Sequence, residues 1–281
     1  MVHTESSFKT ADGLTVFTQT WKPGRDAVAA VALVHGLGEH SGRYAHVAKA
    51  FTEAGFVISA LDLRGHGKSG GTRGHFPSYT AVMDDLDLLL VHIRKNFPGK
   101  PVFLYGHSLG GALVLYYGLT RKSELQGIIA SSPGLAAGSP VSPVTLIIGK
   151  VLYNLLPEMT LPNGLNLEYL SHDPQVKQAY VNDPLVHRKI SARLGLDLLK
   201  NGQFILQKAP GFPYPLLLLQ GSGDRIVDPN ATQTFAQNAG EGVTFRLFDG
   251  QYHELHNETI KEQVLTDMLG WISETLTLSK T

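Results

Sequence analysis

Ser108 lies in a short glycine-rich stretch, YGHSLGG (residues 105–111), between an apolar run and a segment with helical preferences. The spacing Gly106-x-Ser108-x-Gly110 is that of a nucleophile elbow. In such an elbow the glycines let a strand and a helix approach closely, and the serine is pushed into an exposed, strained turn. A serine hydroxyl is a poor nucleophile at neutral pH, so Ser108 would need a general base. The alternative is a glycine-rich turn with a purely structural role.

A carboxylate and a histidine follow Ser108, each in a loop after a later strand-like segment. Asp224 comes after LLLLQ (216–220), and His253 comes after VTFRLF (243–248). Enzymes with a nucleophile elbow take their acid and base in this chain order. We therefore predict that Asp224 orients His253 and that His253 removes the proton of Ser108.

Each of these two partners has a neighbour of the same residue type that could replace it. Asp228 precedes a proline and a helical segment, which is typical of a helix cap followed by proline at the first helical position. His256 stands next to Asn257, which has the character of a cap for the last helix. Asp224 and His253 lie nearer to the strand ends, so the pattern favours them.

An early loop could supply main-chain N–H groups to the reaction. HGLG (35–38) follows the apolar segment AAVALVH (29–35). Elbow enzymes bind the oxyanion of the tetrahedral intermediate with one backbone N–H from this loop and one from the residue after the nucleophile. This assigns the oxyanion hole to the N–H groups of Leu37 and Leu109. Leu109 opens a helix, whose partial positive charge adds to the stabilisation. The alternative is that HGLG is an ordinary loop.

Strand-like and helix-like segments alternate along most of the chain, which predicts an α/β fold with a mostly parallel, doubly wound sheet flanked by helices. Residues 7–21 hold two alternating stretches around Asp12-Gly13, which indicates a hairpin. The most regular helical period runs from Ser78 to Phe97. Further strands are predicted at 29–35, 56–62, 102–106, 127–131, 216–220 and 243–248, and further helices at 43–55 and 260–272.

One region breaks the alternation. Residues 135–208 contain frequent prolines and glycines, recurring helix-like pieces and no buried strand pattern. We predict that this region is a helical cap inserted between two strands. The α/β core would then consist of residues 1–134 and 209–281.

Composition excludes several classes of protein. Lys plus Arg (24) equals Asp plus Glu (24), so the chain lacks the basic excess typical of a nucleic-acid-binding protein. No cysteine is present for a disulfide or a thiolate metal site. His66, His75 and His107 have no metal-site spacing with carboxylates, and we predict neither metal nor cofactor. The first ten residues, MVHTESSFKT, do not resemble a secretory signal, which predicts a cytoplasmic protein.

Five blocks together resemble the monoacylglycerol lipases of the α/β-hydrolase superfamily. They are HGLGEHSGRY (35–44), DLRGHGKSGG (62–71), GHSLGG (106–111), GSGDRIVD (221–228) and YHELHNE (252–258). The resemblance implies the α/β-hydrolase fold, the triad Ser108, Asp224 and His253, and a mobile apolar cap that gates an acyl channel. It also implies cleavage of monoacylglycerols to glycerol and fatty acid through an acyl-enzyme. Leu109 stands where methionine is common in these lipases, and the backbone N–H is unaffected by that difference.

A glycerol head group would need polar partners near the triad. Glu39, Arg43 and His256 flank the oxyanion loop and the predicted catalytic histidine, so we expect them to form the head-group pocket. The alternative is a solvated ion pair together with a histidine at the start of a helix.

The segment VTLIIGKVLYNLL (144–156) has few polar residues on any face. We expect it to belong to the cap, where Ile147, Ile148, Val151 and Leu152 would line the acyl channel and partly dock on a membrane or micelle. Its 13 residues are too few for the roughly 20 that a membrane-spanning helix needs. The alternative is a core helix packed on the sheet.

Two other functions remain open on the sequence. A broader carboxylesterase or a lysophospholipase could use the same triad on a different leaving group. A ligand-binding protein could keep the fold without turnover, although such proteins usually lose a triad residue and none is lost here. Related dehalogenases and epoxide hydrolases carry aspartate at the elbow, so Ser108 argues against those chemistries.

Overall fold

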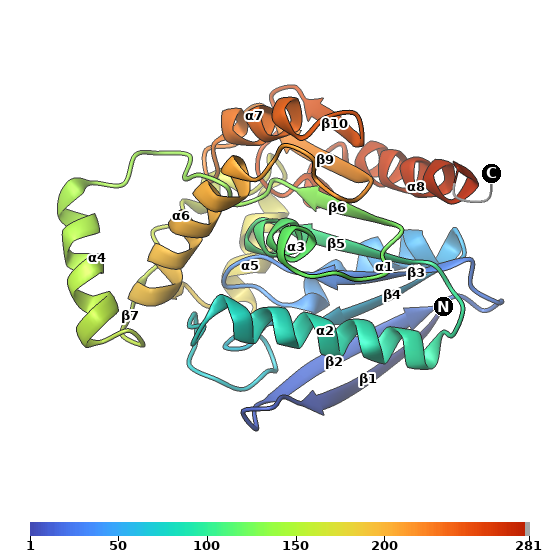
Figure 1. Cartoon of the computed structure of the whole chain (residues 1–281), viewed down its shortest axis with the longest axis horizontal. Helices are drawn as coiled ribbons and strands as arrows, with labels where there is room; N and C mark the ends of the chain where they lie inside the picture. Colours follow the sequence, from blue (N-terminus) through green and yellow to red (C-terminus); the bar gives the residue numbers. More distant parts are fainter. Residues whose placement is uncertain (279–281) are drawn as a thin grey trace.

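An eight-stranded sheet runs through the molecule (Figure 1). The computed structural model describes residues 1–278, and its strands lie in the order β1-β2-β4-β3-β5-β6-β9-β10. Their bounds are β1 Val2–Lys9, β2 Thr15–Lys22, β3 Ala29–Val34, β4 Phe56–Leu61, β5 Val102–His107, β6 Gly127–Ser131, β9 Leu216–Gly221 and β10 Val243–Phe248. From β4 to β10 neighbouring strands are parallel. The strand β2 pairs in the antiparallel sense with β4 on one side and with β1 on the other, and β1 and β2 form the hairpin predicted at Asp12-Gly13.

Helices cover both faces of the sheet, as the alternating pattern predicted. On one face, α2 (Tyr79–Asn96), α3 (Leu109–Thr120) and α7 (Pro229–Ala239) pack against the strands. On the other face lie α1 (Ala45–Glu53) and α8 (Lys261–Leu278). The central strands are buried on both sides, which explains their continuous apolar sequences. Fold class and hairpin are therefore confirmed.

The chain between β6 and β9 forms a separate group of elements. They are α4 (Pro143–Leu155), β7 (Thr160–Pro162), the 3-10 helix η2 (Leu167–Tyr169), α5 (Pro174–Asn182), β8 (Lys189–Ser191) and α6 (Ala192–Gln207). Figure 1 shows α4 standing away from the sheet, with α6 between α4 and α3. The strands β7 and β8 pair with each other, which the sequence did not predict because three residues carry too little periodicity. The cap limits at 135 and 208 stay a prediction.

Among residues 1–278, no helix combines the length and the apolar character needed to cross a membrane.

Candidate active site

Ser108 occupies the sharp turn between β5 and α3. Its backbone lies in a strained region, with φ 55° and ψ −117°. A Cβ atom at Gly106 would lie 2.2 Å from the carbonyl oxygen of Gly110, and one at Gly110 would lie 2.1 Å from that of Val34. The two glycines of the motif are therefore required by the approach of β3, β5 and α3. Ser108 itself is partly exposed, as the elbow pattern predicted.

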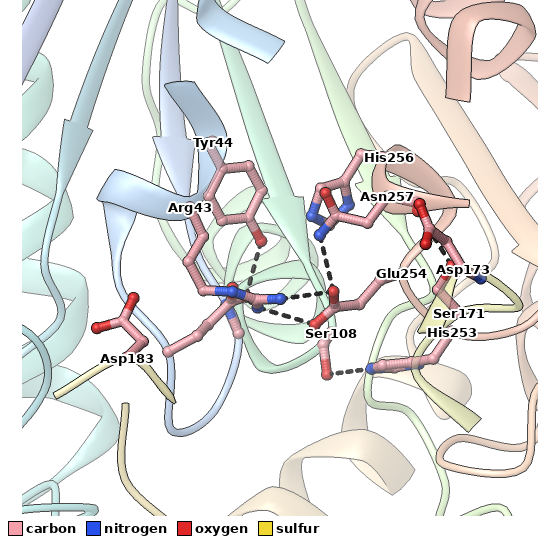
Figure 2. Close-up of polar contacts among 12 residues, drawn as sticks. Arg43, Tyr44, Ser108, Ser171, Asp173, Asp183, His253, Glu254, His256 and Asn257 are labelled. Atoms are coloured by element: carbon pink, nitrogen blue, oxygen red, sulfur yellow. Dashed lines mark hydrogen bonds and ion pairs between the residues drawn. The ribbon is translucent and has the colours of Figure 1, made fainter. Parts of the chain in front are cut away.

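Three loops bring Ser108, His253 and Asp224 into one hydrogen-bonded chain. His253 Nε2 lies 2.9 Å from Ser108 Oγ, and His253 Nδ1 lies 2.8 Å from Asp224 Oδ2. Figure 2 shows the hydroxyl of Ser108 facing the imidazole of His253. Asp224 also accepts hydrogen bonds from two backbone N–H groups, those of Ile226 and Val227. The carboxylate is thus held while it orients the imidazole.

The electrostatics of the pair suit a base and its orienting acid. Burial alone would raise the pKa of Asp224, but attraction and hydrogen bonding to His253 lower it below the ordinary value. Burial opposes protonation of His253, yet the charge and hydrogen bond of Asp224 raise the pKa of its imidazole. Burial and the neighbouring His253 lower the pKa of His107 to about 4. His107 therefore stays neutral while His253 takes up and releases a proton.

Asp228 and Asn257 both have the sequence pattern of a helix cap, and the structure confirms only the first of these. Asp228 caps α7, and its Oδ1 accepts a hydrogen bond from the N–H of Asn230, with Pro229 at the first helical position. Its interpretation as a helix cap is confirmed. The interpretation of Asn257 is wrong, because this residue ends the 3-10 helix η3 (Leu255–Asn257) and α8 begins only at Lys261.

Leu37 and Leu109 lie beside Ser108 and line the same cavity. A Cβ atom at Gly36 would lie 3.2 Å from the Cβ of Ser108, so the HGLG loop passes directly over the nucleophile. The N–H of Gly36 donates to Glu39 Oε1 over 2.6 Å, which ties the loop to the interior. Leu109 is the first residue of α3. Both assigned N–H groups therefore belong to main chain next to Ser108.

Glu39 and Arg43 form a buried ion-pair network behind this loop. Arg43 donates to Glu39 over 2.6 Å. It also donates to both carboxylate oxygens of Glu254, over 2.7 and 2.8 Å (Figure 2). Tyr44 donates to Glu39, and Asn257 donates to Glu254. Burial would raise the pKa of Glu39, but the charge of Arg43, together with His107, His35 and the hydrogen bond from Tyr44, lowers it below the ordinary value.

The structure does not place Glu39, Arg43 and His256 among the residues that line the cavity. Glu39 is 2% exposed and His256 is fully buried, stacked on Tyr44 with ring centroids 4.6 Å apart. The expectation that these side chains form the head-group pocket is therefore corrected. The solvated ion pair offered as the alternative is also wrong, because the pair is buried. The network supports the loop that carries Leu37.

A cavity of about 530 Å³ opens at Ser108 and extends under the inserted elements. This volume lies within the range of roughly 300–1,000 Å³ that small-molecule sites occupy. The wall consists mainly of aliphatic side chains from α4, β7, β8, α6 and the loops after β6 and β9, among them Leu135, Leu146, Leu161, Ile190, Leu196, Leu198 and Val227. No charged side chain lines the cavity in the part of the chain that the structure describes. It can hold an apolar chain next to the nucleophile.

The helix α4 contributes one wall of this cavity and has no buried residue. The alternative of a core helix is therefore wrong. Of the four predicted channel residues, only Ile148 lines the cavity. Ile147 and Val151 are exposed, at 63% and 51%, and Leu152 is half-buried.

Sequence reasoning missed the few polar groups of the cavity wall. They are Thr145 at the start of α4, Asn163 after β7 and Ser191, which ends β8 and caps α6. Asn163 Oδ1 accepts a hydrogen bond from the N–H of Leu165, while its Nδ2 is buried without a protein partner. The Asn-Gly pair at 163–164 was the one available signal, and it indicates only a turn.

A nucleophile elbow, a hydrogen-bonded Ser-His-Asp chain and an inserted group of helices over a parallel sheet define a serine hydrolase of the α/β-hydrolase class. Residues 25–260 match the family model described as "Serine aminopeptidase, S33". The chain belongs to this family and, within it, to the monoacylglycerol lipases.

Three relatives illustrate the likeness. The chain is 36% identical to a monoacylglycerol lipase of Mycolicibacterium smegmatis, over 95% of this chain and 96% of that protein. A crystal structure of the monoacylglycerol lipase of Paleococcus ferrophilus superimposes with a TM-score of 0.83 at 34% identity, over 98% and 100% of the two chains. An uncharacterised abhydrolase domain-containing protein of Dictyostelium discoideum is 38% identical over the whole chain, which spans 30% of that longer protein.

Proposed function

We propose that this protein hydrolyses the ester bond of monoacylglycerols and releases glycerol and a free fatty acid. The observation that carries the proposal is the uncharged, mainly aliphatic cavity of about 530 Å³ that ends at Ser108 Oγ, within 2.9 Å of His253 Nε2. The kinship with proteins named monoacylglycerol lipase supports the same substrate class.

In the proposed reaction, Ser108 Oγ attacks the ester carbonyl while His253 Nε2 takes its proton. Asp224 holds the imidazole by Nδ1 and stabilises the imidazolium that forms. The N–H groups of Leu37 and Leu109 bind the oxyanion of the tetrahedral intermediate. His253 then gives its proton to the departing glycerol oxygen. Water, activated by the same imidazole, hydrolyses the acyl-enzyme and restores Ser108.

The cavity favours this substrate over two others. An aminopeptidase, the activity in the family's description, must bind a charged amine, and no carboxylate lines the cavity among residues 1–278. A lysophospholipase must accept a charged head group, and no lysine or arginine lines it in that range either. A neutral glycerol ester needs neither charge. A broader carboxylesterase acting on other neutral esters is the remaining competitor.

We further propose that the outer face of α4 docks on a membrane or micelle as a peripheral contact. Val144, Ile147, Val151 and Leu155 are 51–72% exposed on this helix, whose other face borders the cavity. An apolar helix face beside a cavity mouth is suited to take up a lipid directly from an interface.

A hydrolysis panel tests the substrate. It would contain mono-, di- and triacylglycerols of several chain lengths, a lysophospholipid, a short aryl ester and a peptide amide, with Ser108→Ala as the inactive reference. We expect the highest kcat/KM for a monoacylglycerol. Faster cleavage of triacylglycerol or lysophospholipid would contradict the proposal. Equal rates on all neutral esters would favour the carboxylesterase.

A further inference from the structure

Ser132 lies between the nucleophile and the catalytic histidine, in the loop that follows β6. It is fully buried, and its Oγ donates a hydrogen bond to the carbonyl oxygen of His253 over 2.8 Å. Its own N–H donates to the carbonyl oxygen of Leu219 on β9 over 2.8 Å. Ser132 therefore joins the end of the sheet to the loop that carries His253. It does not line the cavity and has no part in the reaction described above.

The residues on either side of Ser132 hold the main chain of Ser108. The N–H of Ser108 donates to the carbonyl oxygen of Ser131 over 3.0 Å. The carbonyl oxygen of Ser108 accepts from the N–H of Gly134 over 2.9 Å. A tetrapeptide, residues 131–134, thus contacts the backbone of both the nucleophile and the base. Each contact is a direct hydrogen bond, so the tetrapeptide sets the spacing of the two loops.

The backbone of Ser132 is strained in this position. Its φ is 43°, in the left-handed region where glycine is normally preferred, and Ser108 is the only other non-glycine residue with positive φ in the part of the chain that the structure describes. Strained conformations persist where the surrounding structure over-determines them, and they gather at functional sites. Here serine is present although glycine would relieve the strain. Of the two groups that glycine lacks, the Cβ atom and the hydroxyl, only the hydroxyl makes a hydrogen bond.

We propose that Ser132 is a positioning residue that holds the main chain of His253 at the correct distance from Ser108; this inference rests on the proposed hydrolase function. Asp224 fixes the imidazole ring from one side, through Nδ1. The backbone of His253 is fixed by Ser132 at its carbonyl oxygen and by the carbonyl oxygen of Tyr169 at its N–H, over 3.2 Å. The His253 carbonyl also accepts from the N–H of Leu255, but that bond lies within the same loop and cannot anchor it.

The test compares two variants of Ser132 with a matched control. Ser132→Ala keeps the Cβ atom and removes the hydroxyl, whereas Ser132→Gly removes the hydroxyl and also relieves the strained backbone. Ser59→Ala serves as the control, because Ser59 is equally buried and loses a similar hydrogen bond, 2.9 Å to Thr20, on β4. Thermal unfolding measures the stability of all three. If Ser132→Ala does not fold, the less strained Ser132→Gly carries the test.

The main readout is the rate at which a fluorophosphonate labels Ser108, measured well below the unfolding temperature. We expect both Ser132 variants to be labelled about tenfold to a hundredfold more slowly, the size of effect that a displacement near 1 Å produces. Ser59→Ala should be labelled at the wild-type rate even if its unfolding temperature falls. We also expect the acidic limb of the labelling profile to move to lower pH in the Ser132 variants, because a looser His253 is less well paired with Asp224.

Wild-type labelling of Ser132→Ala would overturn the inference. The inference would also fail if Ser132→Gly were labelled slowly while a folded Ser132→Ala were labelled at the wild-type rate, since the backbone and not the hydroxyl would then be responsible. An equal loss of labelling in Ser59→Ala would reduce the effect to general stability. If the wild-type protein were labelled no faster than Ser108→Ala, the proposed hydrolase function would fail first, and the inference with it.

Discussion

The cavity has two walls that are built in opposite ways. The wall at Ser108 consists of main chain packed so closely that a Cβ atom at Gly110 would overlap the carbonyl oxygen of Val34. The wall at α4 consists of aliphatic side chains on a helix with no buried residue. The first wall leaves no room for an added Cβ atom at Gly106 or Gly110, whereas in the second wall most side chains border solvent or the cavity. The first wall suits chemistry, and the second suits admission of an apolar chain.

The same contrast holds for charge. Behind the Ser108 wall, Glu39, Arg43 and Glu254 form a network whose side chains are at most 9% exposed. Ionised groups are kept in the interior only when they are paired and hydrogen-bonded, and removal of one partner is costly. The α4 wall has no such network on the cavity side. Changes to the two walls should therefore differ greatly in their consequences, and four experiments test that difference.

The largest effect should come from Asp224→Asn. The amide cannot accept the Nδ1 proton in the same way, so the imidazole loses its orientation and its tautomer. We expect kcat to fall by about four orders of magnitude, the size of the same change in a chymotrypsin-type triad. The folded structure should persist, because Asn keeps the shape of the side chain. Single-turnover hydrolysis of an aryl ester measures the loss.

The pH profile of that variant is a second check on the same pair. In the wild-type protein, activity should fall as pH drops through the pKa of His253, which Asp224 holds above the ordinary histidine value. Without the carboxylate of Asp224, burial is opposed only by the weaker effects of Glu254 and Glu39, and the pKa of His253 should fall. The acidic limb should therefore move to lower pH in Asp224→Asn. If the acidic limb of the activity profile lies at the same pH in Asp224→Asn as in the wild type, a group other than His253 controls the loss of activity.

The next effect concerns two glycines, both within helices. Gly110→Ala forces a Cβ atom to within 2.1 Å of a backbone oxygen, so we expect a loss of about 3 kcal/mol or more of unfolding free energy. Gly149→Ala on α4 meets its nearest atoms at 3.7 Å, on Leu196. There we expect no loss, and a gain of up to about 1 kcal/mol from better helix propensity. Urea unfolding of both variants measures the difference. Equal changes in unfolding free energy would contradict the contrast between the two walls.

Glu39→Gln should have a smaller but clear effect. The amide presents donors to Arg43 where the carboxylate accepted, so we expect a loss on the order of 3 kcal/mol of stability. Because the N–H of Gly36 also relies on Glu39, kcat/KM should fall by a similar factor for a monoacylglycerol and for an aryl ester. A selective rise in KM for the monoacylglycerol would instead restore a head-group role. Glu53→Gln, an exposed residue paired with Lys49 over 3.9 Å, is the neutral control.

The two walls also differ in how far the sequence predicted them. The Ser108 wall follows from local rules: the elbow glycines, the loop after β3 and the strand-end positions of Asp224 and His253 are all readable in chain order. In the structure, His253 lies within hydrogen-bonding range of both Ser108 and Asp224. They could not show that Glu39 and Arg43 turn inward, because Glu254, which binds Arg43, lies more than 200 residues away in the chain.

The inserted region was harder to predict because its apolar pattern has two readings. A helix such as 144–156 looks the same whether it packs on a sheet or stands at the surface, so periodicity alone could not tell which side chains face the cavity. Ser132 shows a further limit. Its positive φ and its bond to His253 arise from packing between three loops, and a serine before proline gives no sign of either.

The smallest effect on folding should come from the exposed face of α4. Ile147→Ser with Val151→Ser removes two apolar side chains that are more than half exposed, so unfolding free energy should change by less than about 0.5 kcal/mol. Hydrolysis of a water-soluble aryl ester should be unchanged, since neither side chain lines the cavity. Flotation with phospholipid vesicles should decrease several-fold if this face inserts into the interface. Val91→Ser on α2, where the valine is 57% exposed, is the matched control and should float as the wild type does. Unchanged flotation of the double variant would leave α4 as a wall of the cavity with no membrane role.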